Sequence, residues 1–208
     1  MPCLVAEFSA NIFPMENDFT DIDLMVQFQD GDDRCFEQLV ERHKQRVFNI
    51  AFRYLGNVHD AEDAAQQVFI NIYNLKKSYK PSDAQFTTWL YTVCKNTCLK
   101  TFRREKLKTI SLNQSKELSE GSVPLQVADD KESTPVDDAI SNETDKLVKE
   151  AIDALVENQK MVLILYKYDQ LSYEDIAKVM GVSTKAVKSL LHRARVTLKE
   201  KLADYFNK

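Results

Sequence analysis

The chain has 208 residues, of which 44% are hydrophobic and 29% are charged, and its formal net charge is −4. This length allows one medium domain or two small ones, each with its own core. Only 4 glycines and 5 prolines occur, far below average usage. Such a composition favours a mostly helical chain and argues against sandwiches, barrels and doubly wound sheets, because those folds need many tight turns. No run approaches about 18 consecutive apolar residues, so we expect no transmembrane helix.

The N-terminal segment and the cysteines indicate a cytoplasmic protein. Residues 1–14 lack a basic stretch and contain Glu7, which argues against a signal peptide. The four cysteines are few and scattered, which is typical of reduced thiols. Cys94 and Cys98 lie four residues apart and His43 falls on an apolar stripe, but a metal site would need more ligands. We therefore expect buried thiols, a core histidine and no metal.

The first half of the chain predicts helices separated by short breaks. Thr20 and Asp23 can form a capping box that opens a short helix ending near Phe28. Apolar residues then recur at three- and four-residue steps over residues 36–54. This pattern predicts an amphipathic helix that ends near Gly56.

Two more helices follow in this half. Asp60 is the expected N-cap of the first, whose apolar face reaches Ile72. A basic loop over residues 76–84 leads into the second, which should start near Phe86. Its expected buried face consists of Leu90, Val93, Cys94 and Thr97.

The segment after residue 104 differs in composition. Residues 105–145 carry 4 basic and 10 acidic side chains and include a glycine and two prolines. The segment is rich in serine and shows no lasting apolar period, so it predicts a flexible acidic linker. The chain is thereby divided into an N-terminal extension (residues 1–19), a first domain (20–104), the linker (105–143) and a second domain (144–208).

The second domain also predicts helices, over about residues 145–156, 158–168, 173–180 and 184–206. Ser172 and Asp175 can form another capping box. Gly181 is the expected left-handed C-cap, and Ser183 is the expected cap of the last helix.

The segment from Ser172 to His192 gives the strongest functional signal. Two helices joined by a very short turn, with the small Ala177 followed four residues later by Gly181, have the spacing of a helix-turn-helix. The second helix of that motif enters the major groove of DNA. The alternative is an ordinary helical hairpin with a basic face. We expect the pair to be locked by Ile176, Met180, Val182, Val187 and Leu190, and DNA to be contacted by Ser183, Thr184, Lys185, Lys188, Ser189, His192, Arg193 and Arg195.

A second signal lies in the basic stretch of residues 76–104, which carries 7 basic side chains and 1 acidic one. Aromatic faces stack on bases and cations pair with phosphates, a combination that suits single-stranded DNA. The alternative is that Phe86 and Trp89 are core residues and the arginines are a solvated surface. The candidate residues are Phe86, Thr87, Trp89, Tyr91, Lys95, Asn96, Lys100, Arg103 and Arg104.

A third candidate is the helix that starts at Asp60. Acids in its first turn suit the helix dipole, which explains most of the pattern. The excess of acid and amide groups could also form a protein-docking face made of Asp60, Glu62, Asp63, Gln66, Gln67 and Phe69.

The sequence has no glycine-rich phosphate loop, nucleophile elbow or HExxH motif, so it gives no positive support for an enzyme, a cofactor or a small-molecule substrate.

Taken together, these segments resemble the sigma-70 family, specifically the small two-domain extracytoplasmic-function (ECF) sigma factors. The resemblance covers about residues 20–104 and 145–202, with both halves in order and a linker between them. The matching stretches are Phe36-Glu37-Gln38-Leu39-Val40, Asp60-Ala61-Glu62-Asp63, Gln66-Gln67-Val68-Phe69, Phe86-Thr87-Thr88-Trp89-Leu90-Tyr91, Leu171-Ser172-Tyr173-Glu174-Asp175-Ile176-Ala177, Gly181-Val182-Ser183 and Arg193-Ala194-Arg195. The family's Leu-Pro is Leu155-Val156 here, and its Gly-Thr is Lys185-Ala186.

The resemblance implies an all-α fold of two small helical domains, sigma region 2 and sigma region 4, joined by a flexible linker. It implies a cytoplasmic, non-enzymatic factor that binds core RNA polymerase, recognises promoters and opens them. The acid and amide helix would dock on the polymerase β-prime clamp helices. The helix from Phe86, with Lys80 in the loop before it, would read and open the minus-ten element, and the helix after Ser183 would read the minus-thirty-five element. An anti-sigma factor is a further implied partner.

Two other functions remain open from the sequence. One is a conventional helix-turn-helix regulator with an N-terminal interaction domain, which would have no need of the aromatic and basic stretch or the docking helix. The other is a module that sequesters sigma factors, which the basic residues after Ser183 argue against. Neither basic patch is large, so we expect weak DNA binding by the free chain and strong promoter binding only with polymerase.

Overall fold

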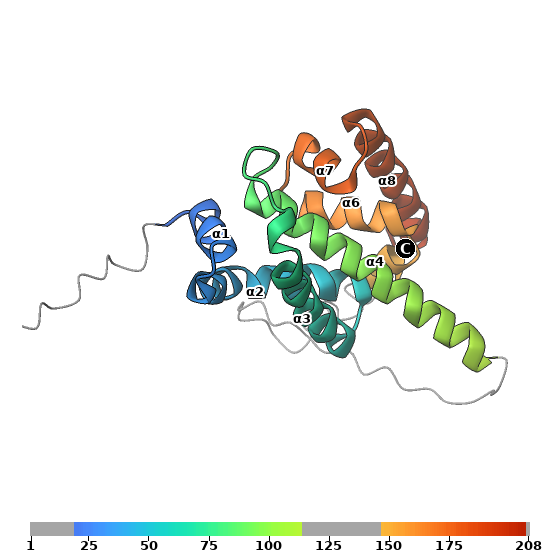
Figure 1. The fold of residues 1–208 in the computed structure, drawn as a ribbon. Helices are drawn as coiled ribbons and strands as arrows, with labels where there is room; N and C mark the ends of the chain where they lie inside the picture. Colours follow the sequence, from blue (N-terminus) through green and yellow to red (C-terminus); the bar gives the residue numbers. More distant parts are fainter. Residues whose placement is uncertain (1–18, 114–146, 207–208) are drawn as a thin grey trace, which may run out of the picture.

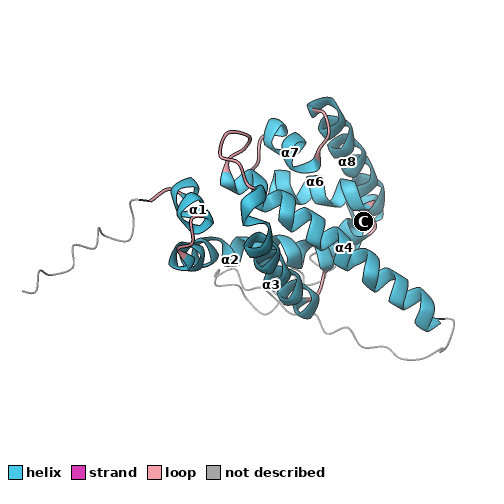
Figure 2. Cartoon of the chain, in the orientation of Figure 1, coloured by secondary structure: helices cyan, strands magenta, loops and turns pink. Residues whose placement is uncertain are grey.

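The computed structural model describes residues 19–113 and 147–206, and helices make up most of both ranges (Figure 2). Within these ranges there is no strand, which confirms the all-α prediction. The predicted N-terminal extension, apart from its last residue, and most of the predicted linker lie outside the described residues.

The first domain, residues 19–113, is a bundle built around one long amphipathic helix. That helix packs against the three other α-helices of the domain. Its buried residues are those of the predicted stripe from Leu39 to Tyr54, except that Val40 is only partly buried, and Cys35 is buried in addition. The elements are α1 (Asp21–Gln29), α2 (Asp33–Leu55), α3 (Val58–Leu75), the 3-10 turn η1 (Lys76–Ser78) and α4 (Phe86–Asn113).

Helix termini in this domain follow the expected capping chemistry with one correction. Thr20 and Asp23 form the predicted capping box, and Gly56 ends α2 in a left-handed conformation with φ of 86°. The prediction that Asp60 caps α3 is wrong. Asn57 is the N-cap, and its side-chain oxygen accepts the Asp60 backbone N–H at 2.8 Å. Asparagine caps as well as aspartate, so the helix begins one turn earlier.

The last helix of the first domain extends beyond residue 104, where the sequence predicts that the domain ends. α4 continues to Asn113, so residues 105–113 are helical although their composition predicts linker. No glycine or proline occurs between Phe86 and Asn113, so nothing in the backbone forces the helix to stop.

The second domain, residues 147–206, contains the predicted helix-turn-helix. Residues 147–153 are helical and are followed by α6 (Glu157–Lys167), α7 (Tyr173–Met180) and α8 (Thr184–Phe206). Gly181 takes the predicted left-handed conformation with φ of 68°. The Ser172 hydroxyl accepts the Asp175 N–H at 3.1 Å, and the Ser183 hydroxyl accepts the Ala186 N–H at 3.2 Å.

One residue expected to lock the helix pair does not do so. Val182 is 40% exposed, whereas Leu191 is only 1% exposed and takes the buried place on α8. Val182 falls in the turn between the two helices, where the helical period does not apply. Ile176 and Val187 are buried as predicted, and Met180 and Leu190 are partly buried against the same core.

The two domains lie against each other in the structure (Figure 1). α4 packs against α7, and α2 packs against α6. The buried apolar residues of both domains form one continuous cluster. This arrangement places the helix-turn-helix beside the α4 surface that the sequence predicts to bind DNA.

Candidate nucleic-acid and protein interfaces

The N-terminal half of α8 presents its polar side chains to solvent. Val187, Leu191 and Ala194 are buried against α6 and α7 and fix the rotation of the helix. The opposite face therefore carries the predicted DNA-contacting residues. All are exposed except Thr184, which is half-buried: Ser183, Lys185, Lys188, Ser189, His192, Arg193 and Arg195.

Aromatic rings of the neighbouring helices lie beneath two of these cations. The Lys188 Nζ lies 5.8 Å from the Tyr173 ring centroid, and the Arg195 guanidinium lies 5.7 Å from the Tyr166 ring centroid. Tyr166 and Tyr173 stack on each other at 5.5 Å. These contacts hold the cations near the surface while leaving their N–H groups directed to solvent, where they can donate to phosphates or base edges.

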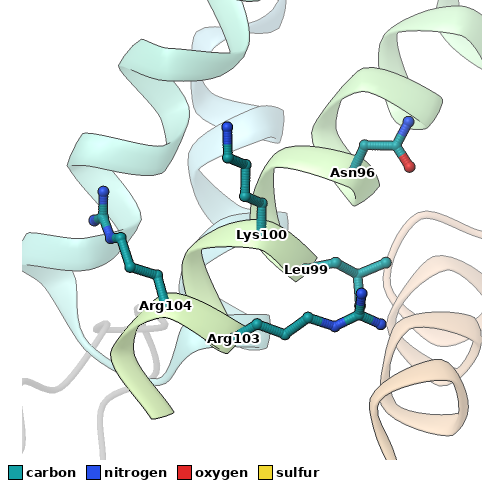
Figure 3. Close-up of a pocket in the computed structure, with 5 residues that line it drawn as sticks. All are labelled: Asn96, Leu99, Lys100, Arg103 and Arg104. Carbon is teal, nitrogen blue, oxygen red and sulfur yellow. The ribbon is translucent and has the colours of Figure 1, made fainter. Parts of the chain in front are cut away.

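The basic residues of α4 surround a surface pocket of about 410 Å³ (Figure 3). Asn96, Lys100, Arg103 and Arg104 line it together with Leu99. Arg103 reaches towards the second domain, whereas Lys100 and Arg104 extend from the other side of the helix. Lys80, in the loop before α4, is also exposed.

The aromatic residues of the same stretch do not all face solvent. Phe86 and Tyr91 are each only 2% exposed, and Phe86 packs on Tyr79 at 6.0 Å between ring centroids. Thr87 is half-buried. Trp89 is half-buried against Tyr79, with ring centroids 5.4 Å apart, so of the three predicted aromatic residues it is the one that a base could reach.

Three of the predicted α4 residues make polar contacts with the second domain, although the Arg103 side chain stays 63% exposed. The Tyr91 hydroxyl donates to Asp169 Oδ1 at 3.3 Å, and the Lys95 Nζ donates to the Val179 carbonyl at 3.0 Å. Arg103 donates two hydrogen bonds to Glu157 Oε2, at 3.0 and 2.9 Å. The sequence analysis did not single out any of the three acceptor residues, Asp169, Val179 and Glu157.

Burial at this contact changes the titration of two α4 side chains. Burial lowers the pKa of the Lys95 ammonium, because desolvation disfavours its charged form. Burial also raises the pKa of the Tyr91 hydroxyl, and the Asp169 carboxylate adds to that shift. Both side chains are thus partly withdrawn from water. We call this packing of the second domain on α2 and α4 the closed arrangement.

The predicted docking face on α3 is only partly free. Glu62, Asp63, Gln66 and Gln67 are exposed, but Phe69 is half-buried and packs on the core. Asp60 is also half-buried, and its carboxylate accepts from Asn57 Nδ2 at 2.7 Å.

One residue of the α3 face escaped the sequence analysis. Ile70 is 51% exposed, next to a pocket of about 240 Å³ between α3 and α4 that is lined by Asp63, Gln66, Gln67, Ile70, Thr101 and Arg104. Ile70 lies outside the apolar period of α3, and this position could have shown from the sequence that the side chain is exposed. The face therefore combines acid and amide groups with an exposed apolar side chain, a composition suited to binding a protein.

The described residues include no cluster of three or more potential metal ligands. A hydrogen bond with Cys98 and burial raise the pKa of the Cys94 thiol, so it is held in its neutral form. The buried His43 lies with Nε2 2.8 Å from the Asp21 carboxylate and anchors α1 to α2. Within the described ranges, no helix has the length and apolarity needed to cross a bilayer.

Comparisons with family models match both domains in order. Residues 39–108 match sigma-70 region 2, and residues 145–198 match sigma-70 region 4. Among curated proteins, the chain is similar to the ECF RNA polymerase sigma factor SigW of Bacillus subtilis, with 30% identity over 86% of this chain and 94% of that protein. It is also similar to the ECF RNA polymerase sigma-E factor of Escherichia coli, with 29% identity over 90% of this chain and 97% of that protein.

Two solved structures share the fold. The structure of CnrH in complex with the cytosolic domain of CnrY matches with a TM-score of 0.62 and 22% identity, over 88% of this chain and 97% of that one. The sigma factor RpoE of Bartonella quintana, in complex with the anti-sigma factor NepR, matches with a TM-score of 0.59 and 23% identity, over 81% and 96%.

Proposed function

Since the chain belongs to the sigma-70 family, among the ECF RNA polymerase sigma factors, we propose that it binds core RNA polymerase, directs it to a specific set of promoters and opens them. The observation that carries this proposal is the exposed face of α8. Its cations and hydroxyls project from the second helix of a helix-turn-helix, where a major groove can reach them. This face reads the minus-thirty-five element.

The α4 surface supplies the second DNA contact. Lys100 and Arg104 provide charge for phosphates, and Trp89 provides a face on which an unpaired base can stack. This surface, with Lys80 in the preceding loop, reads and opens the minus-ten element. Single-strand binding here favours promoter opening, because only separated strands expose the faces of their bases.

The α3 face is the polymerase-docking surface of the proposal. Glu62, Asp63, Gln66 and Gln67 would meet the β-prime clamp helices, with Ile70 as an apolar anchor. Mixed surfaces of this kind bind through a few central residues surrounded by a polar rim. A further partner is an anti-sigma factor, since NepR is bound to the similar RpoE. The factor acts in the cytoplasm, where its polymerase and promoters are, and has no catalytic activity of its own.

Run-off transcription tests the proposal directly. Purified bacterial core polymerase is incubated with genomic fragments from the source organism, with and without the chain. Discrete new transcripts are the expected result, and alignment of their start sites gives both promoter elements. If the chain does not bind core polymerase at all, the proposal is wrong and the conventional regulator takes its place.

A docking variant makes the test specific. The double change Asp63→Ala and Gln67→Ala should weaken co-purification with core polymerase and leave the helical circular dichroism unchanged. The loss should be of the order of 1–2 kcal/mol, a usual value for residues near the centre of an interface. The matched control is Glu37→Ala with Gln38→Ala on α2, which removes one acid and one amide at a different site.

A further inference from the structure

The loop between η1 and α4, residues 79–85, is closed by one of its own side chains. The Tyr79 hydroxyl donates to the Ala84 carbonyl at 3.2 Å, across the loop. The Tyr79 side chain is only 3% exposed, and its ring packs on Trp89. Lys80 lies next to this anchor and is exposed. The loop is therefore a built turn that presents a cation beside the accessible aromatic residue of α4.

A side chain of α1 holds the start of this loop. The Gln29 Nε2 donates to two carbonyls, that of Lys76 at 2.6 Å and that of Tyr79 at 2.9 Å. An amide nitrogen carries two N–H groups, so one side chain can serve both acceptors. Tyr79 follows directly after η1, and the carbonyls at the end of a helical turn need partners from outside it. Gln29 therefore fixes the backbone at the point where the loop leaves the turn.

A return contact comes from Lys76. Its Nζ donates to the Phe28 carbonyl at 3.1 Å and lies 4.0 Å from the centroid of the Phe28 ring. Phe28 lies in the last turn of α1, which contains no basic residue of its own. The helix dipole favours a cation at a helix C-terminus, and the ring quadrupole favours a cation over an aromatic face. α1 and the segment that starts the loop are therefore bonded in both directions.

α1 is itself fixed on the rest of the first domain. Three of its residues are fully buried. At its N-terminal end, Asp21 accepts from Arg42 at 3.1 Å and lies 2.8 Å from the buried His43. None of the residues that the sequence predicts to contact DNA or polymerase lies on α1. α1 therefore anchors the loop to the domain without taking part in the predicted interfaces.

We propose that Gln29 and Lys76 are positioning residues for reading the minus-ten element: they seat the loop on α1, so that Lys80 and Trp89 present a fixed site to an unpaired base. A seated loop has less freedom to lose on binding, so a matching base keeps more of the energy of its contacts. A loosened loop adjusts to several bases and distinguishes them less. This inference rests on the proposed function for the ligand, whereas the seating of the loop is a property of the chain alone.

The fluorescence of Trp89 tests the seating. Trp89 is the only tryptophan of the chain, and it packs on Tyr79, whose carbonyl Gln29 holds. Gln29→Met keeps the length of the side chain and removes both donors. The emission of this variant should shift to longer wavelengths, and acrylamide should quench it more strongly than in the parent chain. Gln45→Met is the matched control and should behave like the parent, because Gln45 is an exposed amide on α2 that donates only to Asn49.

A second pair of variants tests the return contact and keeps the proposal testable if Gln29→Met does not fold. Lys76→Met removes the bond to the Phe28 carbonyl. Lys77→Met removes the same charge from the next residue, which is exposed and makes no hydrogen bond or ion pair within the described residues. Lys76→Met should change the Trp89 emission in the same direction as Gln29→Met, and Lys77→Met should leave it unchanged.

Discrimination between promoters tests the positioning itself. Holoenzyme is formed from core polymerase and each variant, and permanganate footprinting measures open complexes on a promoter found by run-off transcription. The same promoter with single-base changes in the minus-ten element is the comparison. At the base that the loop reads, Gln29→Met should reduce the preference for the original base about fivefold, near the lower end of what one stacked base contributes. Co-purification with core polymerase should not change, because the proposed docking face lies on α3.

Three results would overturn the proposal. The first is Trp89 fluorescence in Gln29→Met and Lys76→Met that matches their controls, and the second is an unchanged preference for the original minus-ten bases. The third is an equal loss of core binding and base preference, which would make both residues merely structural. A failure of the proposed function would instead appear as absent transcripts with the parent chain, and the fluorescence results would then still decide whether α1 seats the loop.

Discussion

α8 and α4 are both basic helices with predicted roles in DNA binding, but they differ in how many of their predicted contact residues are free. α8 exposes nearly all of its predicted contact residues, whereas α4 commits Tyr91, Lys95 and Arg103 to the second domain. The difference lies in what covers each helix. One face of α8 packs within its own domain and the other is free, while α4 packs within its own domain and is then covered by the next one. A DNA-reading surface can therefore be complete in sequence and still be closed in the folded chain.

The largest expected effect comes from releasing α8 from its own domain. Leu191→Ala should lower the free energy of unfolding of the second domain by about 2–5 kcal/mol, because it removes a nearly fully buried side chain. Urea denaturation followed by circular dichroism measures the loss. Val182→Ala, in the exposed turn residue, is the control and should change stability by less than about 0.5 kcal/mol.

The next effect concerns the accessible aromatic residue of α4. Trp89→Ala should impair promoter opening more than polymerase binding, since it removes a stacking face worth about 1–3 kcal/mol per base. Permanganate footprinting of the opened strand and co-purification with core polymerase measure the two steps separately. Equal loss in both assays would mean that Trp89 serves only to pack against Tyr79.

A pair of lysine changes compares the two helices directly. In the free chain, Lys185→Met on α8 should weaken binding to duplex DNA and reduce the magnitude of the log–log salt slope by about 0.9, as expected for one phosphate contact. Lys95→Met should leave the affinity and the slope nearly unchanged, because its ammonium already donates to Val179. Equal slopes for the two variants would contradict the closed arrangement.

The smallest expected effect is a pH dependence of domain closure. Burial raises the pKa of Asp169 in the closed arrangement, although Arg46, Tyr91 and Arg53 oppose this, and the Cys94 thiol also lies nearby. Closure should therefore be strongest below the ordinary carboxyl pKa of about 4 and weaken as pH rises through the raised value. Energy transfer between dyes attached at Ser82→Cys and Lys199→Cys, two exposed positions in different domains, measures it between pH 4 and 7. Asp169→Asn, which cannot ionise, should flatten the profile.

Most of the helices were predictable because their signals are local. Apolar periodicity identified the buried stripe of α2, and Gly56, Gly181, Ser172 and Ser183 marked helix ends through backbone conformation and side-chain caps. The errors were also local in origin. Asn57 and Asp60 are equally good caps three residues apart, and composition alone could not show that α4 continues to residue 113.

The domain contact was not predictable in the same way. Asp169 and Tyr91 are 78 residues apart, and nothing in the local sequence of either marks the pairing. One signal was present on α4, where Leu90, Tyr91, Val93 and Cys94 are all buried. These four residues extend around more of the helix than one stripe, a pattern typical of a helix covered from more than one side. The pattern indicates that a second element packs on α4, but it does not identify that element.

The pairing of α4 cations with acceptors of the second domain has a consequence for ions in solution. Lys95 donates to a backbone carbonyl and Arg103 pairs with Glu157, so in the closed form neither side chain is available to neutralise a phosphate. Fewer of the cations condensed on a single strand are then released when the strand binds. The log–log salt slope for single-strand binding should therefore be smaller in magnitude for the closed chain than for an opened one, by about 0.7 per cation.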